Sequence, residues 1–241
     1  MENQAGSGKH SIWINMTTVL DLKNVHLTLS SRAGAVEILR GVDVQAQAGE
    51  AISIVGPSGS GKTSLLMVIA GLEAATSGAV RVNNHSLNNR GEADLAKFRR
   101  DNIGIIFQSF HLIPTMTAME NVAIPLEFKG DKSAFARARE GLAKVGLAHR
   151  LDHYPGQLSG GEQQRVAIAR AVTSGAKILL ADEPTGNLDQ ETGETIINLL
   201  VELKQREQAT LLLVTHDKSL ASRCNRILEV RDGKVTEGRK N

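Results

Sequence analysis

The stretch Gly56-Pro57-Ser58-Gly59-Ser60-Gly61-Lys62-Thr63 matches the phosphate-loop pattern G-x-x-x-x-G-K-[ST] at every fixed position. The apolar, β-branched run 51–55 before it predicts a buried strand, and residues 64–70 after it predict the start of a helix. The motif requires this strand–loop–helix order. Its glycines let the backbone turn tightly and aim several N–H groups, with the positive end of a helix dipole, at one anion. The sequence therefore predicts that the loop binds a nucleoside triphosphate.

Two carboxylates form the second half of the expected site. In this interpretation Lys62 reaches the β- and γ-phosphates and the Thr63 hydroxyl ligates Mg²⁺. The apolar run 178–181 predicts a strand that ends at Asp182 and Glu183. Asp182 can meet Mg²⁺ beside Thr63, while Glu183, one residue further, can orient or deprotonate a water at the γ-phosphate. A solvated strand end is the alternative, but the pair favours hydrolysis over binding alone.

The composition limits the function classes. The chain has 241 residues, with 28 Lys and Arg against 26 Asp and Glu, so its net charge of +2 argues against nucleic acid as a partner. It contains no apolar run of the ~20 residues that span a bilayer and no apolar export segment near its start. The one cysteine, Cys224, allows no internal disulfide and suits a reducing compartment. We expect a cytoplasmic protein without a direct lipid anchor.

The order of the expected elements indicates an α/β core. Strands are expected at 19–29, 36–46, 51–55, 79–82, 103–107, 177–181, 210–214 and 226–235, and helices after 64 and at 93–100, 117–128, 132–145, 159–171 and 191–206. Three successive helices without a strand indicate a helical insertion at about 109–172. Pro125 is expected to kink or break the first of them. Residues 17–241 form one expected domain after a flexible tail, 1–16, in which Gly6-Ser7-Gly8-Lys9 imitates a phosphate loop without a strand before it.

A second glycine motif, Leu158-Ser159-Gly160-Gly161-Glu162-Gln163-Gln164, stands at the start of an expected helix. By itself it indicates only a helix capped by Ser159. With the phosphate loop, Gln108, the carboxylates, Asn187-Leu188-Asp189 and His216, however, it has the order and spacing of the ABC ATPase cassette. The chain resembles that family over about residues 18–238.

The resemblance implies a P-loop NTPase (RecA-like) core with an N-terminal antiparallel β-subdomain and an inserted α-helical subdomain. It also implies ATP and Mg²⁺ as cofactors and a head-to-tail homodimer that encloses two ATP molecules. Ser159, Gly160 and Gly161 of one subunit would contact the γ-phosphate held by residues 59–63 of the other. Glu183 would be the general base, His216 the γ-phosphate sensor, Gln108 a link between Mg²⁺, water and a membrane partner, and Asp189 a residue of the dimer seam. The nucleotide contacts would come from Gly56, Pro57, Ser58, Gly59, Ser60, Gly61, Lys62, Thr63 and Ser64.

A finer resemblance lies in residues 107–126 (FQSFHLIPTMTAMENVAIPL) and 181–189 (ADEPTGNLD). They are similar to the branch that serves lipoprotein release, macrolide export and cell division (LolD-, MacB- and FtsE-like cassettes), and within it to YbbA-type cassettes. This implies an ATPase subunit on the cytoplasmic face of a bacterial inner membrane. It would drive a separate integral membrane subunit for export, lipoprotein handling or mechanotransmission. Phe110, Leu112, Ile113 and Met116 would line the groove for that subunit, or pack inside the insertion instead.

One departure concerns the nucleotide base. Cassettes of this family usually stack an aromatic residue on adenine about 27 positions before the loop, which falls near Leu29, and no Phe, Tyr or Trp occurs between Trp13 and Phe98. An aliphatic side chain can cover a base but lacks the stacking component. We therefore expect weak discrimination between ATP and GTP.

Two other functions stay open at this stage. One is a regulatory switch, in which ATP binding and dimerisation signal to a membrane or cell-envelope partner and nothing is transported. The other is an ABC protein that acts on DNA or ribosomes, which the single unbroken cassette and the small net charge argue against.

Overall fold

The computed structural model describes residues 17–31 and 34–238. The expected tail 1–16, with Gly6–Lys9, lies outside the described residues, as does part of the turn between the first two strands. The strands are β1 (Thr18–Ser31), β2 (Gly34–Gln47), β3 (Ala51–Val55), β4 (Ser77–Val82), β5 (His85–Ser86), β6 (Ile103–Phe107), β7 (Ile178–Asp182), β8 (Thr210–Val214), β9 (Arg226–Arg231) and β10 (Lys234–Glu237). The helices are α1 (Lys62–Ile69), α2 (Glu92–Asn102), α3 (Ala118–Glu127), α4 (Ala134–Lys144), the short 3-10 helix η1 (Pro155–Gln157), α5 (Gly160–Thr173), α6 (Gln190–Arg206) and α7 (Lys218–Ala221).

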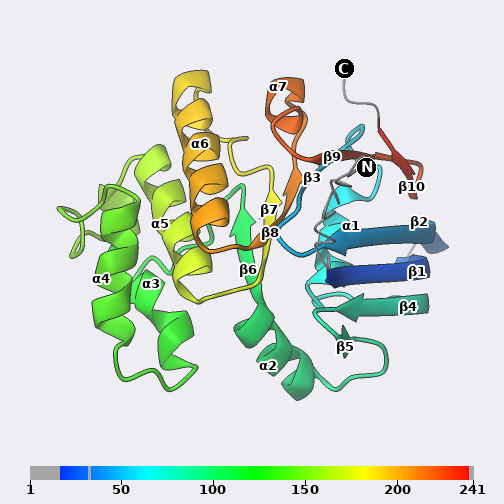
Figure 1. The fold of residues 1–241 in the computed structure, drawn as a ribbon, viewed down its shortest axis with the longest axis horizontal. Coiled ribbons are helices and arrows are strands. Elements are labelled where there is room, and N and C mark those ends of the chain that lie inside the picture. Colours follow the sequence, from blue (N-terminus) through cyan, green and yellow to red (C-terminus); the bar gives the residue numbers. More distant parts are fainter. Residues whose placement is uncertain (1–16, 32–33, 239–241) are drawn as a thin grey trace, which may run out of the picture.

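A six-stranded sheet forms the centre of the molecule, in the order β10-β9-β3-β8-β7-β6 (Figure 1). Strands β9, β3, β8, β7 and β6 run parallel, and β10 pairs with β9 in the antiparallel direction. Ile54 and Asp182 both pair with Val214, so β3, β8 and β7 end at the same edge of the sheet. The segments that follow these strands therefore start side by side, which is where ligands bind in open α/β sheets.

The central strands β3, β7 and β8 are buried on both faces of this sheet, which explains why they are nearly continuous apolar runs in the sequence. In β7, Ile178 and Leu180 belong to the core shared with α1 and the N-terminal strands. Leu179 and Ala181, which point to the other face, belong to the core shared with α3 to α6. The alternation follows from the two-residue period of a strand.

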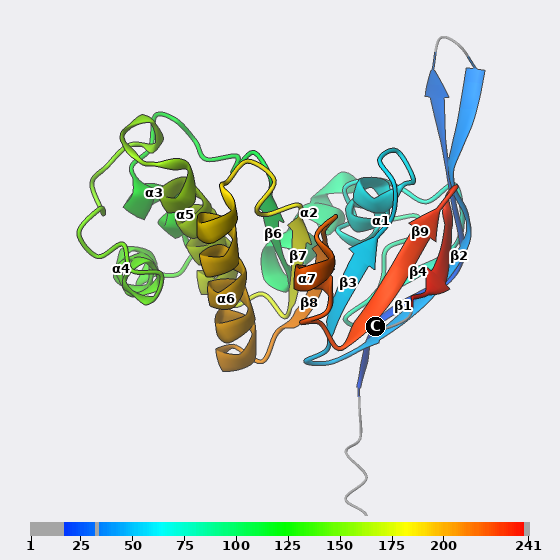
Figure 2. The ribbon, with the colours of Figure 1, turned by 90° about the horizontal axis from the view of Figure 1, so that it is seen from above.

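The N-terminal strands form a second, four-stranded sheet in the order β2-β1-β4-β5, with every pair antiparallel. Strands β1 and β2 extend past the rest of the molecule as a hairpin (Figure 2). On that extension Leu29 pairs with Val36, and both side chains are exposed.

Helices α3, α4 and α5 follow β6 and precede β7, and they pack together at one end of the molecule (Figures 1 and 2). Thr117 and Ser159 each begin a helix with a reciprocal capping box, in which the N-cap side chain and a glutamate three residues later bond each other's backbone N–H. The structure thus confirms the expected fold class: an α/β core, an N-terminal antiparallel sheet and inserted helices.

Three local expectations need correction. Pro125 does not end α3: only the bond from its missing N–H is lost, and Phe128 N still bonds Ile124 O at 3.1 Å to close the last turn. The single strand expected at 226–235 is a hairpin, because Asp232 and Gly233 adopt positive φ of 50° and 77° and reverse the chain. Strand β5 and helix α7 were not expected, since two and four residues are too short to show a period.

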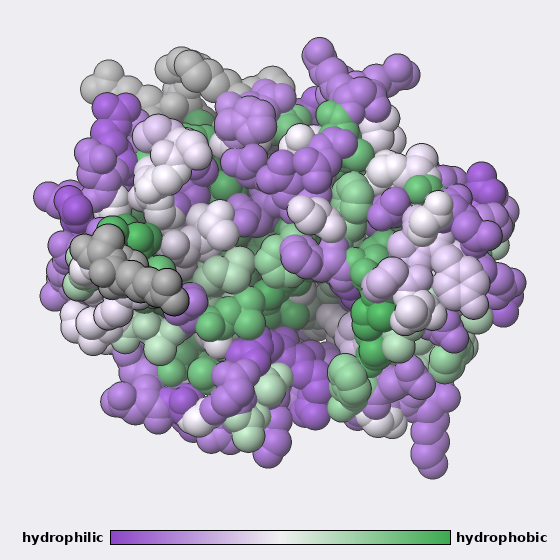
Figure 3. Space-filling model, turned by 180° about the vertical axis from the view of Figure 1, so that it is seen from behind, coloured by the Kyte–Doolittle hydropathy of each residue, from purple (hydrophilic) through white to green (hydrophobic). Residues whose placement is uncertain are grey.

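Seen from behind, hydrophobic side chains gather in a hollowed band across the middle of the molecule, with hydrophilic side chains around it (Figure 3). Within residues 17–31 and 34–238, no helix is long and apolar enough to cross a membrane.

Candidate functional site

The phosphate loop connects β3 to α1 and depends on its glycines. Gly56, Gly59 and Gly61 have φ of 151°, 75° and 103°, which side chains disfavour. A Cβ on Gly56 would lie 2.1 Å from Val230 O, and a Cβ on Gly61 would lie 3.0 Å from Ile38 O. The loop therefore packs directly against the backbones of β9 and β2, which fixes its curvature.

Two buried polar groups of the loop are suited to phosphate. Lys62 is only 8% exposed, and its Nζ donates to Gly56 O at 3.0 Å and to Pro57 O at 2.9 Å. The Ser60 hydroxyl is buried without a hydrogen-bond partner among the described residues. A buried ammonium held only by carbonyls and an unpaired buried hydroxyl are costly unless a ligand satisfies them. Phosphate oxygens are acceptors that would satisfy both groups at the N-terminus of α1.

Asp182 ends β7 and contacts the phosphate loop. Burial raises the pKa of Asp182 above its ordinary value, and the neighbouring Glu183 charge raises it further. A hydrogen bond from Thr63 and the charge of Lys62 oppose this rise in the pKa. The sheet thus brings Thr63 and Asp182 together, as the sequence predicts.

These residues fit Mg²⁺ rather than a metal held by protein alone. Within the described residues, no group of three or more His, Cys, Asp or Glu side chains could hold a metal ion. Mg²⁺ is commonly bound by one or two protein oxygens together with substrate phosphates and water. Thr63 and Asp182 supply such oxygens next to the phosphate loop.

Glu183 and His216 leave neighbouring strands and meet above the sheet edge. Glu183 has a φ of 45°, unusual for a residue with a Cβ, and its N–H bonds Val214 O at 3.1 Å. His216 follows β8, is exposed, and places Nδ1 at 3.5 Å from Glu183 Oε2. The two residues expected to act on the γ-phosphate are therefore close to each other.

Gln108 follows β6 and is bonded to the segment after Glu183. Its Nε2 donates to Asn187 Oδ1 at 3.1 Å, and Asn187 Nδ2 donates to Gln108 O at 3.1 Å. Sequence reasoning assigned Asn187 no role of its own. The only available signal was its place within the Asn187-Leu188-Asp189 motif.

Asp189 is the N-cap of α6. Its Oδ1 accepts from Thr192 N at 2.9 Å and its Oδ2 from Thr192 Oγ1 at 2.7 Å, and these hydrogen bonds lower the pKa of Asp189. Both of its oxygens are thus engaged in starting a helix.

The second glycine motif is not joined to the phosphate loop of its own chain. Ser159 Oγ accepts from Glu162 N at 3.2 Å and so caps α5. A Cβ on Gly160 would lie 3.3 Å from Leu188, and one on Gly161 would lie 2.6 Å from Thr192, so both glycines face the segment that begins α6. Among the described residues, no hydrogen bond or ion pair links Ser159, Gly160 or Gly161 to residues 56–64.

The residues expected to line the groove lie on a segment that side chains of α5 and α3 hold by hydrogen bonds. Phe110 and His111 have positive φ of 61° and 47°, and Arg170 of α5 donates to both of their carbonyls, at 2.8 and 2.6 Å. Asn121 of α3 is buried and bonds Ile113 at both its N–H, at 2.8 Å, and its carbonyl, at 3.1 Å. Leu112 packs against the helical core, as the alternative interpretation expected, while Phe110, Ile113 and Met116 are half-buried.

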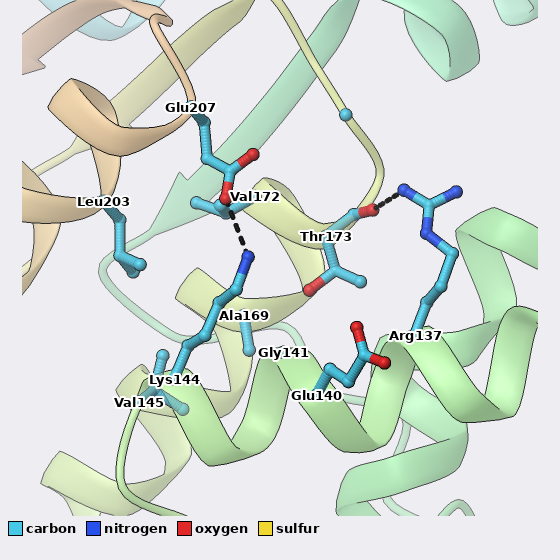
Figure 4. A pocket seen from close by; sticks show the side chains of 11 residues that line it. Arg137, Glu140, Gly141, Lys144, Val145, Ala169, Val172, Thr173, Leu203 and Glu207 are labelled. Carbon is cyan, nitrogen blue, oxygen red and sulfur yellow. Dashed lines mark hydrogen bonds and ion pairs between the residues drawn. The ribbon is translucent and has the colours of Figure 1, made fainter.

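A separate pocket lies between α4, α5 and the end of α6 (Figure 4). Lys144 reaches across it to Glu207 at 2.9 Å, and Arg137 donates to Thr173 O at 2.8 Å and pairs with Asp131. Since its cations are already neutralised or bonded, this pocket is a packing feature that joins α4 to the core.

Comparison with known proteins identifies the class of protein. The family model described as ABC transporter matches residues 39–186, which contain the phosphate loop, the second glycine motif and both carboxylates. The chain belongs to the ABC transporter family, and it is an ATP-binding cassette that hydrolyses ATP.

Individual relatives place it in one branch of that family. It is 48% identical to the ABC transporter ATP-binding protein YbbA of Escherichia coli K12, over 88% of this chain and 95% of YbbA. It is 46% identical to the lipoprotein-releasing system ATP-binding protein LolD of Geobacter metallireducens, over 91% of this chain and 99% of LolD. It is 42% identical to the macrolide export ATP-binding/permease protein MacB of E. coli K12, over 91% of this chain but only 34% of MacB.

A solved structure agrees with this placement. The ATP-binding cassette MJ0796, in a dimeric post-hydrolysis state with ADP and Pi, is 42% identical and superposes with a TM-score of 0.85 over 92% of this chain and 99% of that one. The resemblance to the ABC branch of LolD, MacB and YbbA is confirmed.

Proposed function

We propose that this chain is the ATPase subunit of a bacterial inner-membrane complex, in which two copies close on ATP and drive a separate membrane subunit. One observation carries the proposal: in the part of the chain that the structure describes, the second glycine motif is well formed but makes no hydrogen bond or ion pair to the phosphate loop. A second copy, placed head to tail, supplies the missing half. The dimeric state of the similar cassette MJ0796 supports this arrangement.

In this proposal, the loop from Gly56 to Ser64 holds the phosphates. Lys62 exchanges its two carbonyl partners for β- and γ-phosphate oxygens, and Ser60 gains the partner that its buried hydroxyl lacks. Thr63, Asp182 and Gln108 are the residues that would hold Mg²⁺. When bound there, Mg²⁺ would supply positive charge that offsets the negative charge of the phosphates.

Glu183 takes the proton of the attacking water, and His216 contacts the γ-phosphate beside it. Their 3.5 Å separation supports a shared task. Ser159, Gly160 and Gly161 of the second copy complete the γ-phosphate site with N–H groups at the start of α5. Asp189, at the start of the adjacent α6, lies at the seam between the copies.

In this proposal, the membrane subunit binds to the segment around Phe110, Ile113 and Met116. Gln108, at the start of this segment, couples binding of the membrane subunit to the ATP site. The chain then works at the cytoplasmic face of the inner membrane. We further propose one domain over residues 17–241, with the helical insertion at about 109–172. The names of LolD and MacB suggest lipoprotein handling and export as the functions of the complex. Mechanotransmission to the membrane subunit is the third function that we propose.

The test uses tagged Glu183→Gln protein that is expressed in its native host. Mg-ATP is added to trap the protein in its ATP-bound state. Mildly solubilised membranes are purified on the tag and the co-purifying proteins are identified by mass spectrometry, with wild-type protein in ADP as the control. A polytopic membrane protein that is retained only by the trapped variant supports the proposal. Ribosomal or DNA-repair proteins, or no membrane protein, overturn it. Retention of an envelope regulator that transports nothing favours a signalling switch instead.

A further inference from the structure

Asn187 and Gln108 exchange two hydrogen bonds across 79 residues of sequence. One joins the two side-chain amides, and the other joins the Asn187 side chain to the Gln108 backbone. Gln108 is proposed to contact the metal and the water. Asn187 is proposed to contact neither of them, but it bonds Gln108 directly.

This pair leaves only one arrangement for both amide groups. A backbone carbonyl can only accept, so the NH₂ group of Asn187 must face Gln108 O. Its other amide atom, Oδ1, then faces the Gln108 side chain and can only accept as well. The Gln108 side chain must therefore donate to Asn187 Oδ1 from its own NH₂ group, which turns Gln108 Oε1 away from Asn187.

The surroundings hold Asn187 in place. A Cβ on Gly186 would lie 2.6 Å from Gln108 Nε2 and 2.9 Å from its Cδ, so the Gln108 amide lies against the Gly186 backbone. Gly186 N bonds Glu183 O at 3.0 Å and Leu188 N bonds Thr185 O at 3.0 Å, which turns the chain after Glu183. The residue that orients Gln108 is therefore built into the turn that carries the proposed general base.

We propose that Asn187 is a positioning residue that presents Gln108 with its amide oxygen free. Among the described residues, no hydrogen bond engages Gln108 Oε1. Mg²⁺ binds oxygen ligands and gains nothing from an amide NH₂ group, so the orientation of this amide decides whether Gln108 can serve as a ligand. Outer partners of metal ligands commonly act in this way. The inference rests on the proposed role of Gln108.

The experiment compares Asn187→Leu, which keeps the approximate volume and loses both bonds, with Gln190→Leu, an exposed amide three residues on that serves as the matched control. The Mg²⁺ concentration for half-maximal ATPase activity is measured in full-length protein. We expect Asn187→Leu to raise it about tenfold and Gln190→Leu to leave it unchanged. In a Gln108→Ala background, Asn187→Leu should add less than about twofold, because residues that act as one unit are not additive.

A second readout does not depend on turnover. In nucleotide-free protein, NMR should show slowed hydrogen exchange of the Gln108 side-chain amide, and Asn187→Leu should abolish the protection while Gln190→Leu keeps it. An unchanged Mg²⁺ requirement, an equal shift without Gln108, or an unprotected amide in the wild type each overturns the proposal. Failure of the proposed function would be seen differently: the Glu183→Gln variant would neither dimerise nor retain a membrane protein.

Discussion

His216 Nδ1 lies 3.5 Å from Glu183 Oε2, across the ends of the neighbouring strands β8 and β7. The imidazole is largely exposed, so a pair of this kind contributes little to folding. Its significance is positional. The hydrogen bond from Glu183 N to Val214 O ties the Glu183 backbone to the strand that leads to the histidine, so both side chains start from the same sheet edge.

The first prediction concerns Glu183. Glu183→Gln should keep ATP binding and lower kcat by about 10²–10⁴-fold, the usual contribution of a general base. An ATP-bound dimer should accumulate because ATP that bridges two copies favours their association. ATPase assays and size-exclusion chromatography with light scattering measure both effects. Glu202→Gln, exposed near the C-terminal end of α6, is the control. A Glu183→Gln protein that stays monomeric in saturating Mg-ATP with its partner present would show that the site is not shared between two copies.

The second prediction concerns pH. Burial raises the pKa of Asp182 in the folded protein. A carboxyl whose pKa is raised on folding contributes stability below its unfolded pKa, and that contribution is lost as the pH rises through the folded value. Without nucleotide, Asp182→Asn should therefore be at least as stable as the wild type at neutral pH, and its advantage should disappear as the pH is lowered.

Under the proposed role of Asp182 as a Mg²⁺ ligand, Mg-ATP should reverse this comparison, because a carboxylate must be ionised to bind the metal. Mg-ATP should raise the Tm of the wild type, less so as the pH falls toward the pKa of Asp182, and should raise the Tm of Asp182→Asn much less. Thermal unfolding across a pH series measures both. A wild-type Mg-ATP stabilisation that is independent of pH down to the ordinary aspartate range contradicts the prediction.

The third prediction concerns the base of the nucleotide. Leu29, near the position at which the resemblance implies an aromatic side chain stacked on adenine, is aliphatic and exposed, and Val36 paired with it on β2 is exposed as well. The kcat/KM for ATP should exceed that for GTP by less than about tenfold, since stacking contributes about 0.5–1.5 kcal/mol beyond burial. Leu29→Tyr should raise the preference for ATP, with Leu72→Tyr as an exposed control on another loop. A wild-type preference of tenfold or more would contradict the prediction.

The fourth prediction concerns Arg170. Its guanidinium donates to the carbonyls of Phe110 and His111 and forms no ion pair within the described part of the chain. Arg170→Met keeps the apolar stem but loses both bonds, and should lower the free energy of unfolding by about 1–3 kcal/mol. Hydrogen exchange of residues 109–113 should accelerate more than that of β3, which is distant in the sheet. Arg139→Met, exposed on α4, is the control. Equal exchange of the 109–113 segment in both variants would show that Arg170 does not hold it.

The sequence by itself determined the features that depend on neighbouring residues. The glycines of the phosphate loop, the capping boxes at Thr117 and Ser159, and the apolar runs of β7 and β8 each encode a local backbone conformation. The order of these elements along the chain predicted the fold class. Asp182 was correctly expected beside Thr63, because Asp182 ends one parallel strand and Thr63 belongs to the phosphate loop that follows another.

Only the tertiary structure decided which distant residues share a bond. The pairs Gln108–Asn187 and Arg170–Phe110 depend on the order β8-β7-β6 and on α5 packing beside β6, and no periodicity records either. The role of Asp189 as the N-cap of α6 was likewise recognised only from its hydrogen bond with Thr192 N. A residue's neighbours in sequence set its φ and ψ, whereas its neighbours in space are set by how whole strands and helices bury their apolar faces.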